Sequence, residues 1–145
     1  MRQTIGWREC VDLPELKLFG LKAKVDTGAK TSSLHVAAVT PSGASDKPWL
    51  ELSLVVEQNA NATIRRAQSV GKRRVKSSTG HVEERHVIVT MLRLAGEEFP
   101  IEVTLSDRAD MTFPMLIGRS ALRGRFLVDC AKSYRRSSSR KLSRR

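Results

Sequence analysis

Alternating apolar and polar positions cover most of the chain. The clearest alternation is in residues 49–57, where Leu50, Leu52, Leu54 and Val56 share one face of an expected half-buried strand. Shorter runs of this kind recur, and the run over residues 15–25 is broken at Gly20. The other single strands that we expect are 33–40, 99–107 and 125–129. Many short strands with frequent turns predict an all-β barrel or sandwich.

One hairpin and one short helix complete the expected elements. Residues 73–94 indicate two strands joined by the turn Ser77-Ser78-Thr79-Gly80. The apolar run 113–118 ends in Gly118, and residues 119–123 are long enough for one turn of helix. Residues 59–74 are polar and only weakly patterned.

The charge divides the chain into two parts. The whole chain has 26 Lys and Arg against 15 Asp and Glu, a net charge of +11. Seven of the basic residues and no acidic one lie in residues 132–145, so residues 1–131 have 19 basic and 15 acidic residues, a net charge of +4. We therefore expect one domain over residues 1–131 and a basic, Ser/Arg-rich, disordered tail over residues 132–145.

The expected cellular location rests on the cysteine content and on the lack of a recognisable signal peptide or membrane span. Two cysteines, Cys10 and Cys130, are too few for a disulfide scaffold and are interpreted as reduced thiols. Residues 1–10 have no apolar segment of a signal peptide, and no apolar run approaches the roughly 18 residues of a membrane span. We expect a cytoplasmic protein with no membrane partner.

Metal, nucleotide and serine chemistry lack the spacing that each needs. His81 and His86 are five residues apart in a strand-like context, whereas the helical zinc motif needs two His four apart. Gly71-Lys72 is followed by Arg73 and not by the Ser or Thr of a phosphate-binding loop. No Gly-x-Ser-x-Gly elbow occurs. The sequence predicts no metal site and no cofactor.

The strongest candidate chemistry lies in "KAKVDTGAKTSSLH", residues 22–35. A strand pattern ends in Asp26, and Thr27 and Gly28 follow. Gly28 leaves room for its N–H to approach a carboxylate, and Thr27 is able to fix the loop by a hydrogen bond. Aspartic hydrolysis needs such a rigidly held carboxylate, because two of them must share one proton and activate a water. Asp26, Thr27 and Gly28 are the predicted catalytic residues.

Several blocks resemble those of the RimB-type retropepsin-like aspartic peptidases, a family often described as ATP-dependent zinc proteases. The matching blocks are "IGWRE" (5–9), residues 22–35, "VKSSTGHVEERHVI" (75–88) and residues 99–129, which include Leu116-Ile117-Gly118. The resemblance covers about residues 5–130. It implies a closed β-barrel with a flap hairpin, active as a homodimer. It also implies removal of added glutamates from the tail of a ribosomal protein, and hence association with the ribosome.

The chain by itself also indicates a homodimer. Asp26 begins the only Asp-Thr-Gly or Asp-Ser-Gly triplet, and 145 residues are too few for two catalytic lobes. A second carboxylate must therefore come from Asp26 of another copy across a two-fold axis.

Basic residues surround the predicted catalytic loop and flap. A cleft lined by them would concentrate acidic peptides. The predicted substrate-binding residues are Lys24, Lys30, Arg74, Lys76, His81, Arg85 and Arg119. An alternative for each of them is an ordinary solvated surface residue.

Two other functions stay open at this point. The fold could serve as a catalytically idle binding module. The basic tail could instead indicate an RNA-associated protein that contacts phosphates without sequence preference, although the chain lacks the interleaved aromatic residues of a base-stacking surface.

Overall fold

The computed structural model describes residues 2–55, 62–76, 79–106 and 112–134, and within them the chain is almost entirely β-structure. The strands are β1 (Gln3–Gly6), β2 (Arg8–Leu13), β3 (Leu18–Asp26), β4 (Ser32–His35), β5 (Ala38–Ser42), β6 (Trp49–Leu54), β7 (Thr63–Gln68), β8 (Gly71–Lys76), β9 (Val82–Leu94), β10 (Glu97–Ser106), β11 (Met115–Gly118) and β12 (Phe126–Asp129). A 3-10 turn, η1 (Pro14–Leu16), and one short helix, α1 (Arg119–Leu122), complete the fold. The predicted all-β class with one short helix is confirmed.

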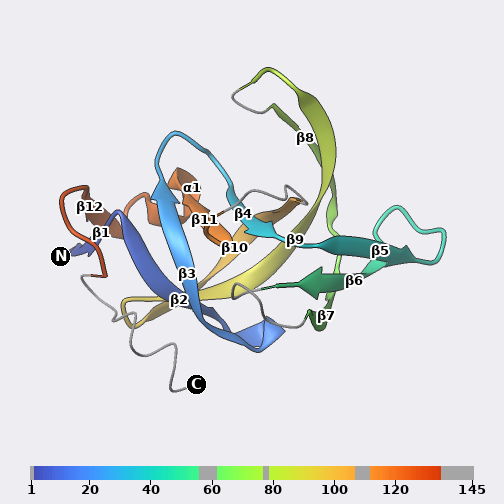
Figure 1. The fold of residues 1–145 in the computed structure, drawn as a ribbon, viewed down its shortest axis with the longest axis horizontal. Helices are drawn as coiled ribbons and strands as arrows, with labels where there is room; N and C mark the ends of the chain where they lie inside the picture. Colours follow the sequence, from blue (N-terminus) through green and yellow to red (C-terminus); the bar gives the residue numbers. More distant parts are fainter. Residues whose placement is uncertain (1, 56–61, 77–78, 107–111, 135–145) are drawn as a thin grey trace.

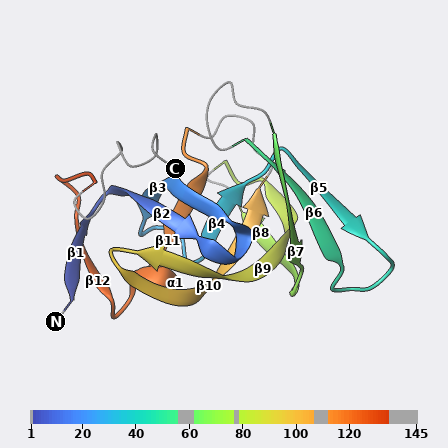
Figure 2. The same cartoon turned by 90° about the horizontal axis from the view of Figure 1, so that it is seen from below.

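The main sheet closes on itself. Its strand order is β10-β4-β11-β3-β2-β9-β8, and β9 also pairs with β10. Six strands therefore form a ring of pairings, and β8 lies outside the ring, where it pairs with the first half of β9 (Figures 1 and 2). The apolar side chains of the ring point inward, and Leu34, Leu92, Met115 and Ile117 are each fully buried.

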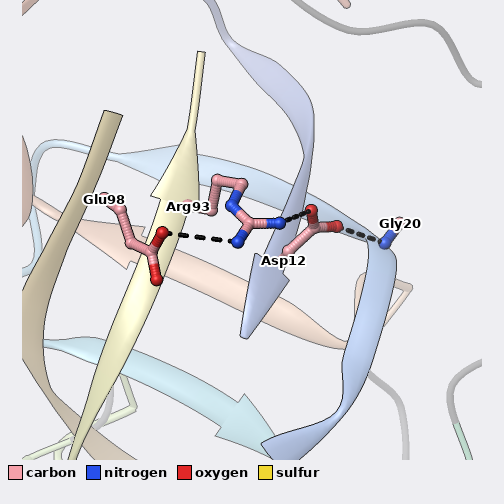
Figure 3. A network of polar contacts seen from close by, with 4 residues as sticks. All are labelled: Asp12, Gly20, Arg93 and Glu98. Carbon is pink, nitrogen blue, oxygen red and sulfur yellow. Dashed lines mark hydrogen bonds and ion pairs between the residues drawn. The ribbon is translucent and has the colours of Figure 1, made fainter. Parts of the chain in front are cut away.

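The ring closes between β2 and β9 through a single residue pair, Asp12 and Arg93. One carboxylate oxygen of Asp12 accepts a hydrogen bond from the Gly20 amide at 2.8 Å, and the other accepts one from Arg93 at 3.5 Å. Arg93 also donates to Glu98 on β10 at 3.3 Å (Figure 3). Gly20, where the alternating sequence pattern is broken, has a φ of +66° within β3, a backbone conformation that favours glycine.

A second sheet of three strands, β5-β6-β7, projects from one side of the ring (Figure 1). It corrects two expectations. The run 33–40 is not one strand: it divides into β4 in the ring and β5 in the second sheet. The weakly patterned stretch 59–74 contains β7, an edge strand whose side chains are at most half-buried, so no apolar alternation marks it.

The predicted hairpin is confirmed. Strands β8 and β9 are antiparallel with Lys76 opposite Val82, and the pair arches away from the body at the top of Figure 1. Gly80 has a φ of +86°, as expected for a turn. Ser77 and Ser78 of the predicted turn lie outside the described residues. We call this pair, β8 with the part of β9 up to Val87, the flap hairpin.

The first residues of the expected tail pack against the body. Residues 132–134, assigned to the tail by their charge, hydrogen-bond to the body: Trp7 donates to the Lys132 carbonyl and Tyr134 to the Arg8 carbonyl, each at 2.8 Å. Residues 135–145 lie outside the described residues, so the disordered tail stays a prediction. In the part of the chain that is described, no helix is long and apolar enough to cross a membrane.

Candidate active site

The loop after β3 holds the carboxylate of Asp26 by local contacts. The Gly28 amide donates to Asp26 Oδ1 at 3.1 Å, and the Ala29 amide donates to the Asp26 carbonyl at 3.2 Å. A Cβ atom on Gly28 would lie 3.2 Å from the same carboxylate oxygen. Glycine at this position therefore allows the close approach that fixes the carboxylate.

Strand β11 supports this loop from beneath. It runs parallel to β3, with Gly118 opposite Asp26, and the Gly118 amide donates to Ser32 Oγ at 3.1 Å. A Cβ atom on Gly118 would lie only 2.6 Å from the backbone of Thr31. The chain needs a glycine here because the backbone of residues 30–31, which follows the Asp26 loop, passes directly over it.

Arg119 ties helix α1 to the same loop. Its backbone amide donates to the Ala29 carbonyl at 2.9 Å, and its guanidinium donates to the carbonyls of Thr27 and Gly28 at 3.4 and 3.1 Å. The Asp26 loop is therefore held both by the backbone amide of Arg119 and by its guanidinium.

A cleft of about 630 Å³ opens between this loop and the flap hairpin. Its wall includes Asp26, Gly28 and Ala29 of the loop and Leu116 of β11. The other lining residues are Lys30, Thr31, Ser33, Arg73, Arg74, Val75, Lys76, Arg85, Thr104, Ser106 and Arg119.

The structure brings together most of the predicted site residues. Asp26 and Gly28 line the cleft with five of the predicted substrate-binding cations: Lys30, Arg74, Lys76, Arg85 and Arg119. Three predicted residues are absent from its lining: Lys24, Thr27 and His81. Thr27 still belongs to the loop through its carbonyl, whereas Lys24 is an exposed residue of β3 and His81 an exposed residue of the flap turn.

The cations of the cleft differ in what they contact. Arg85, whose side chain is only 9% exposed, donates to Glu83 at 2.6 Å, and Arg119 is bound to the loop carbonyls. Across the described part of the chain, the side chains of Lys30, Arg74 and Lys76 make no hydrogen bond or ion pair. Among the described residues that line the cleft, Asp26 is the one carboxylate and six residues are basic, so this lining is strongly cationic.

Several polar lining residues were not predicted from the sequence. Thr104 and Ser106 lie on the cleft side of β10, whereas Val103 and Leu105, which alternate with them, belong to the core. Ser33 lies opposite Thr104 on β4. The signal available was the alternation itself. On the face of 99–107 opposite the core side chains, Pro100 and Glu102 are followed by the hydroxyl residues Thr104 and Ser106.

His86 of β9 lies outside this cleft and lines a neighbouring cavity of about 220 Å³. Its Nδ1 is 2.9 Å from Ser69 Oγ. Burial, and next the charge of Lys72, lower the pKa of His86 from its ordinary value. Among the residues that the structure describes, no group of three or more His, Cys, Asp or Glu is arranged to hold a metal ion.

Curated relatives match most of this chain but extend well beyond it. A probable alpha-L-glutamate ligase of Shewanella halifaxensis is 37% identical over 132 residues, which is 90% of this chain and 29% of the relative. One of Parasynechococcus marenigrum is 39% identical and is covered to 28%. The chain thus spans less than a third of the length of these relatives.

A solved structure and a family comparison agree on the fold. The crystal structure of a protein of unknown function from Legionella pneumophila superposes with a TM-score of 0.74 at 25% identity, covering 94% of this chain and 100% of that one. The sequence model of the family described as RimB-like, retropepsin-like aspartic endopeptidase matches residues 4–139. With its Asp-Thr-Gly loop seated on β11 beneath a flap hairpin, this chain belongs to the RimB-like family of retropepsin-like aspartic endopeptidases.

Proposed function

We propose that the protein is an aspartic peptidase that acts as a homodimer and hydrolyses peptide bonds in acidic, oligoglutamate-type chains. The observation that carries the proposal is the arrangement around Asp26. Its carboxylate is fixed by the Gly28 amide in the wall of a cleft that is otherwise cationic.

The dimer follows from the chemistry that the site needs. Peptide hydrolysis by carboxylates uses a pair that shares one proton, and among the described residues of the cleft only Asp26 is acidic. In the proposed dimer, one Asp26 accepts a proton from the attacking water, and the partner's Asp26 donates a proton to the oxygen of the scissile carbonyl. As the C–N bond breaks, the amide nitrogen takes up the proton that the first Asp26 received from the water, and a hydroxyl of the tetrahedral intermediate returns a proton to the partner's Asp26.

The substrate class follows from the charge of the cleft. Six basic residues line it: Lys30, Arg73, Arg74, Lys76, Arg85 and Arg119. A cleft of one sign of charge raises the local concentration of the opposite sign. Glutamate side chains, ionised above roughly pH 4.3, fit this field.

The relatives supply an independent reason to consider glutamate chains. Proteins described as probable alpha-L-glutamate ligases contain a stretch that is 37–39% identical to 90% of this chain. A ligase that adds glutamates and a peptidase that removes them would act on the same acidic tail. We propose that such a tail, on a ribosomal protein, is the substrate of this chain in the cytoplasm, which brings it to the ribosome.

The same relatives favour one alternative. If the domain serves a ligase by holding the growing chain, it is a binding module that needs the cationic cleft but no catalysis. In that case replacement of Asp26 would leave the function unchanged.

The test compares hydrolysis of a pentaglutamate peptide by the wild-type protein and by Asp26→Asn. The asparagine is isosteric and keeps an oxygen for the Gly28 amide, so we expect an intact fold and a loss of rate of at least about 10³-fold. A peptide with Gln in place of Glu should be cleaved poorly, and added salt should raise KM for the Glu peptide alone. A variant that keeps more than a few per cent of the rate would exclude the aspartic mechanism. Equal cleavage of the Glu and Gln peptides at low salt would exclude the acidic substrate.

A further inference from the structure

Arg73 connects three parts of the molecule that are distant in sequence. It lies on β8 of the flap hairpin and lines the cleft. Its Nη2 is 3.0 Å from Glu102 Oε1 on β10, and its Nη1 donates to Thr31 Oγ1 at 3.3 Å. Thr31 follows the Asp26 loop directly. One guanidinium therefore holds a glutamate carboxylate and contacts the end of the catalytic loop at the same time.

This ion pair is open to solvent. The side chains of Arg73 and Glu102 are 43% and 50% exposed. Exposed pairs of this kind are worth only about 0–1 kcal/mol, because water screens the attraction and two long side chains must be held still. A second carboxylate that enters the cleft could therefore replace Glu102 at little cost.

Two of the other three arginines of the cleft are less suited to this exchange, and the third, Arg74, holds no carboxylate among the described residues that an incoming glutamate could replace. Arg85 is mostly buried against Glu83, and Arg119 is committed to the carbonyls of the Asp26 loop. Arg73 combines an exposed side chain with a carboxylate at Nη2, while its Nη1 contacts Thr31. Lysine has no planar fork that could make both contacts in this way.

We propose that Arg73 binds a glutamate side chain of the substrate, and that Glu102 occupies this position while the cleft is empty. The inference rests on the proposed acidic substrate and deepens it, since it names the residue that selects glutamate and an internal competitor for it. Glu102 also lines a neighbouring cavity of about 250 Å³ with Thr31, which gives the displaced side chain a place to turn.

Arg93 and Glu98 form a matched control pair. Glu98 lies on β10 like Glu102, and its Oε2 is 3.3 Å from Arg93 Nη2. The side chain of Arg93 is 43% exposed and that of Glu98 is 42% exposed. The pair lies beside Asp12 at the β2–β9 joint and lines no part of the cleft (Figure 3). Glu98→Gln removes the same charge from the same strand as Glu102→Gln, so it reports the general electrostatic effect alone.

The experiment measures binding of a fluorescein-labelled pentaglutamate by anisotropy, with the full chain carrying Asp26→Asn to prevent turnover. In this background Glu102→Gln should lower Kd by roughly twofold to fivefold, the range set by an exposed pair. Arg73→Gln should raise Kd about tenfold or more, and Arg73→Lys should restore only part of the loss. Glu98→Gln should shift Kd by less than about 1.5-fold, as expected for a distant, screened charge.

The double variant decides between competition and a general charge effect. If Glu102 acts by occupying Arg73, its replacement has no effect once Arg73 is Gln, so Arg73→Gln and the double variant should bind alike. The proposal is overturned if Glu102→Gln behaves like Glu98→Gln, if the double variant keeps the gain of Glu102→Gln, or if Arg73→Gln binds as well as its parent. Melting temperatures within about 2 °C of the parent show that the variants are folded.

The outcome is separable from that of the proposed function. Hydrolysis by the wild-type chain tests catalysis, whereas these Kd values test recognition in a chain that does not turn over. Absence of hydrolysis with the expected Kd pattern would reject the peptidase and keep the Arg73 site. Hydrolysis without the pattern would reject the Arg73 site alone.

Discussion

Gly118→Ala tests the contact on which the geometry of the site depends. Gly118 has φ −83° and ψ 166°, which alanine adopts without strain, so the effect of the substitution is purely steric. The added Cβ would lie 2.6 and 2.7 Å from the carbonyl carbon and oxygen of Thr31 and 2.9 Å from the carbonyl carbon of Lys30. These are backbone atoms, which cannot rotate away as the end of a side chain does.

The magnitude follows from the distance. Carbon atoms pack at about 3.5–4.0 Å, so the backbone at residues 30–31 must move by roughly 1 Å. Overpacking of this kind costs about 1–3 kcal/mol, or a fall in Tm of about 4–12 °C at roughly 4 °C per kcal/mol. Because the displaced segment carries the Asp26 loop, we expect the rate to fall about 10²-fold, as for a displacement of about 1 Å at a reacting group.

The measurement pairs kcat/KM on pentaglutamate with thermal unfolding, and Gly96→Ala is the control. Gly96 lies between β9 and β10 with φ +81°, and no atom lies within 4 Å of the position of its Cβ. Its replacement should cost about 1 kcal/mol of backbone strain and leave the rate unchanged. The prediction is wrong if Gly118→Ala retains more than a tenth of the wild-type kcat/KM, or if its loss of kcat/KM is no larger than that of Gly96→Ala. In either case the close contact between the loop and β11 does not position the Asp26 carboxylate.

Two further predictions concern the flap hairpin. Gly80 has a φ of +86°, and the space around the position of its Cβ is open. Gly80→Val should strain the exposed turn and reduce the turnover rate more than Tm. Equal losses of rate and Tm would show that the hairpin is core and not a lid. His86 has a lowered pKa in the folded chain, so the unfolded chain takes up a proton first as the pH falls. Its contribution to stability is complete above about pH 6.5 and is lost as the pH falls through the folded pKa. Tm should therefore drop less between pH 7.5 and pH 5 in His86→Gln than in the wild-type protein. Identical drops in the two proteins would contradict the lowered pKa of His86.

Local sequence determined the elements that depend on neighbouring residues. The alternation in 49–57 predicts β6, because burial of one face requires apolar residues at every second position. The Asp26 loop was also predictable, since the bond from the Gly28 amide to the carboxylate spans only two residues. The flap turn followed in the same way from the glycine at position 80, whose φ is positive.

Alternation does not say to which sheet a strand belongs. The run 33–40 is continuous in pattern, yet His35 ends a strand of the ring and Ala38 begins one of the projecting sheet. Strand β7 was missed for the opposite reason. Its side chains are at most half-buried along an edge, so its place is set by pairing with β6 and by the bond from Arg65 to the Leu16 carbonyl.

The roles of the basic residues were decided by the tertiary structure. From the sequence, Arg119 and Arg74 had the same expected role. The placement of β11 beside β3 directs the Arg119 guanidinium to the loop carbonyls, whereas the Arg74 side chain on β8 has no partner among the described residues. The contact among Thr31, Arg73 and Glu102 joins residues from three separated segments. Charge and hydrophobicity specify which residues avoid the core, whereas the order and register of the strands specify which of them meet.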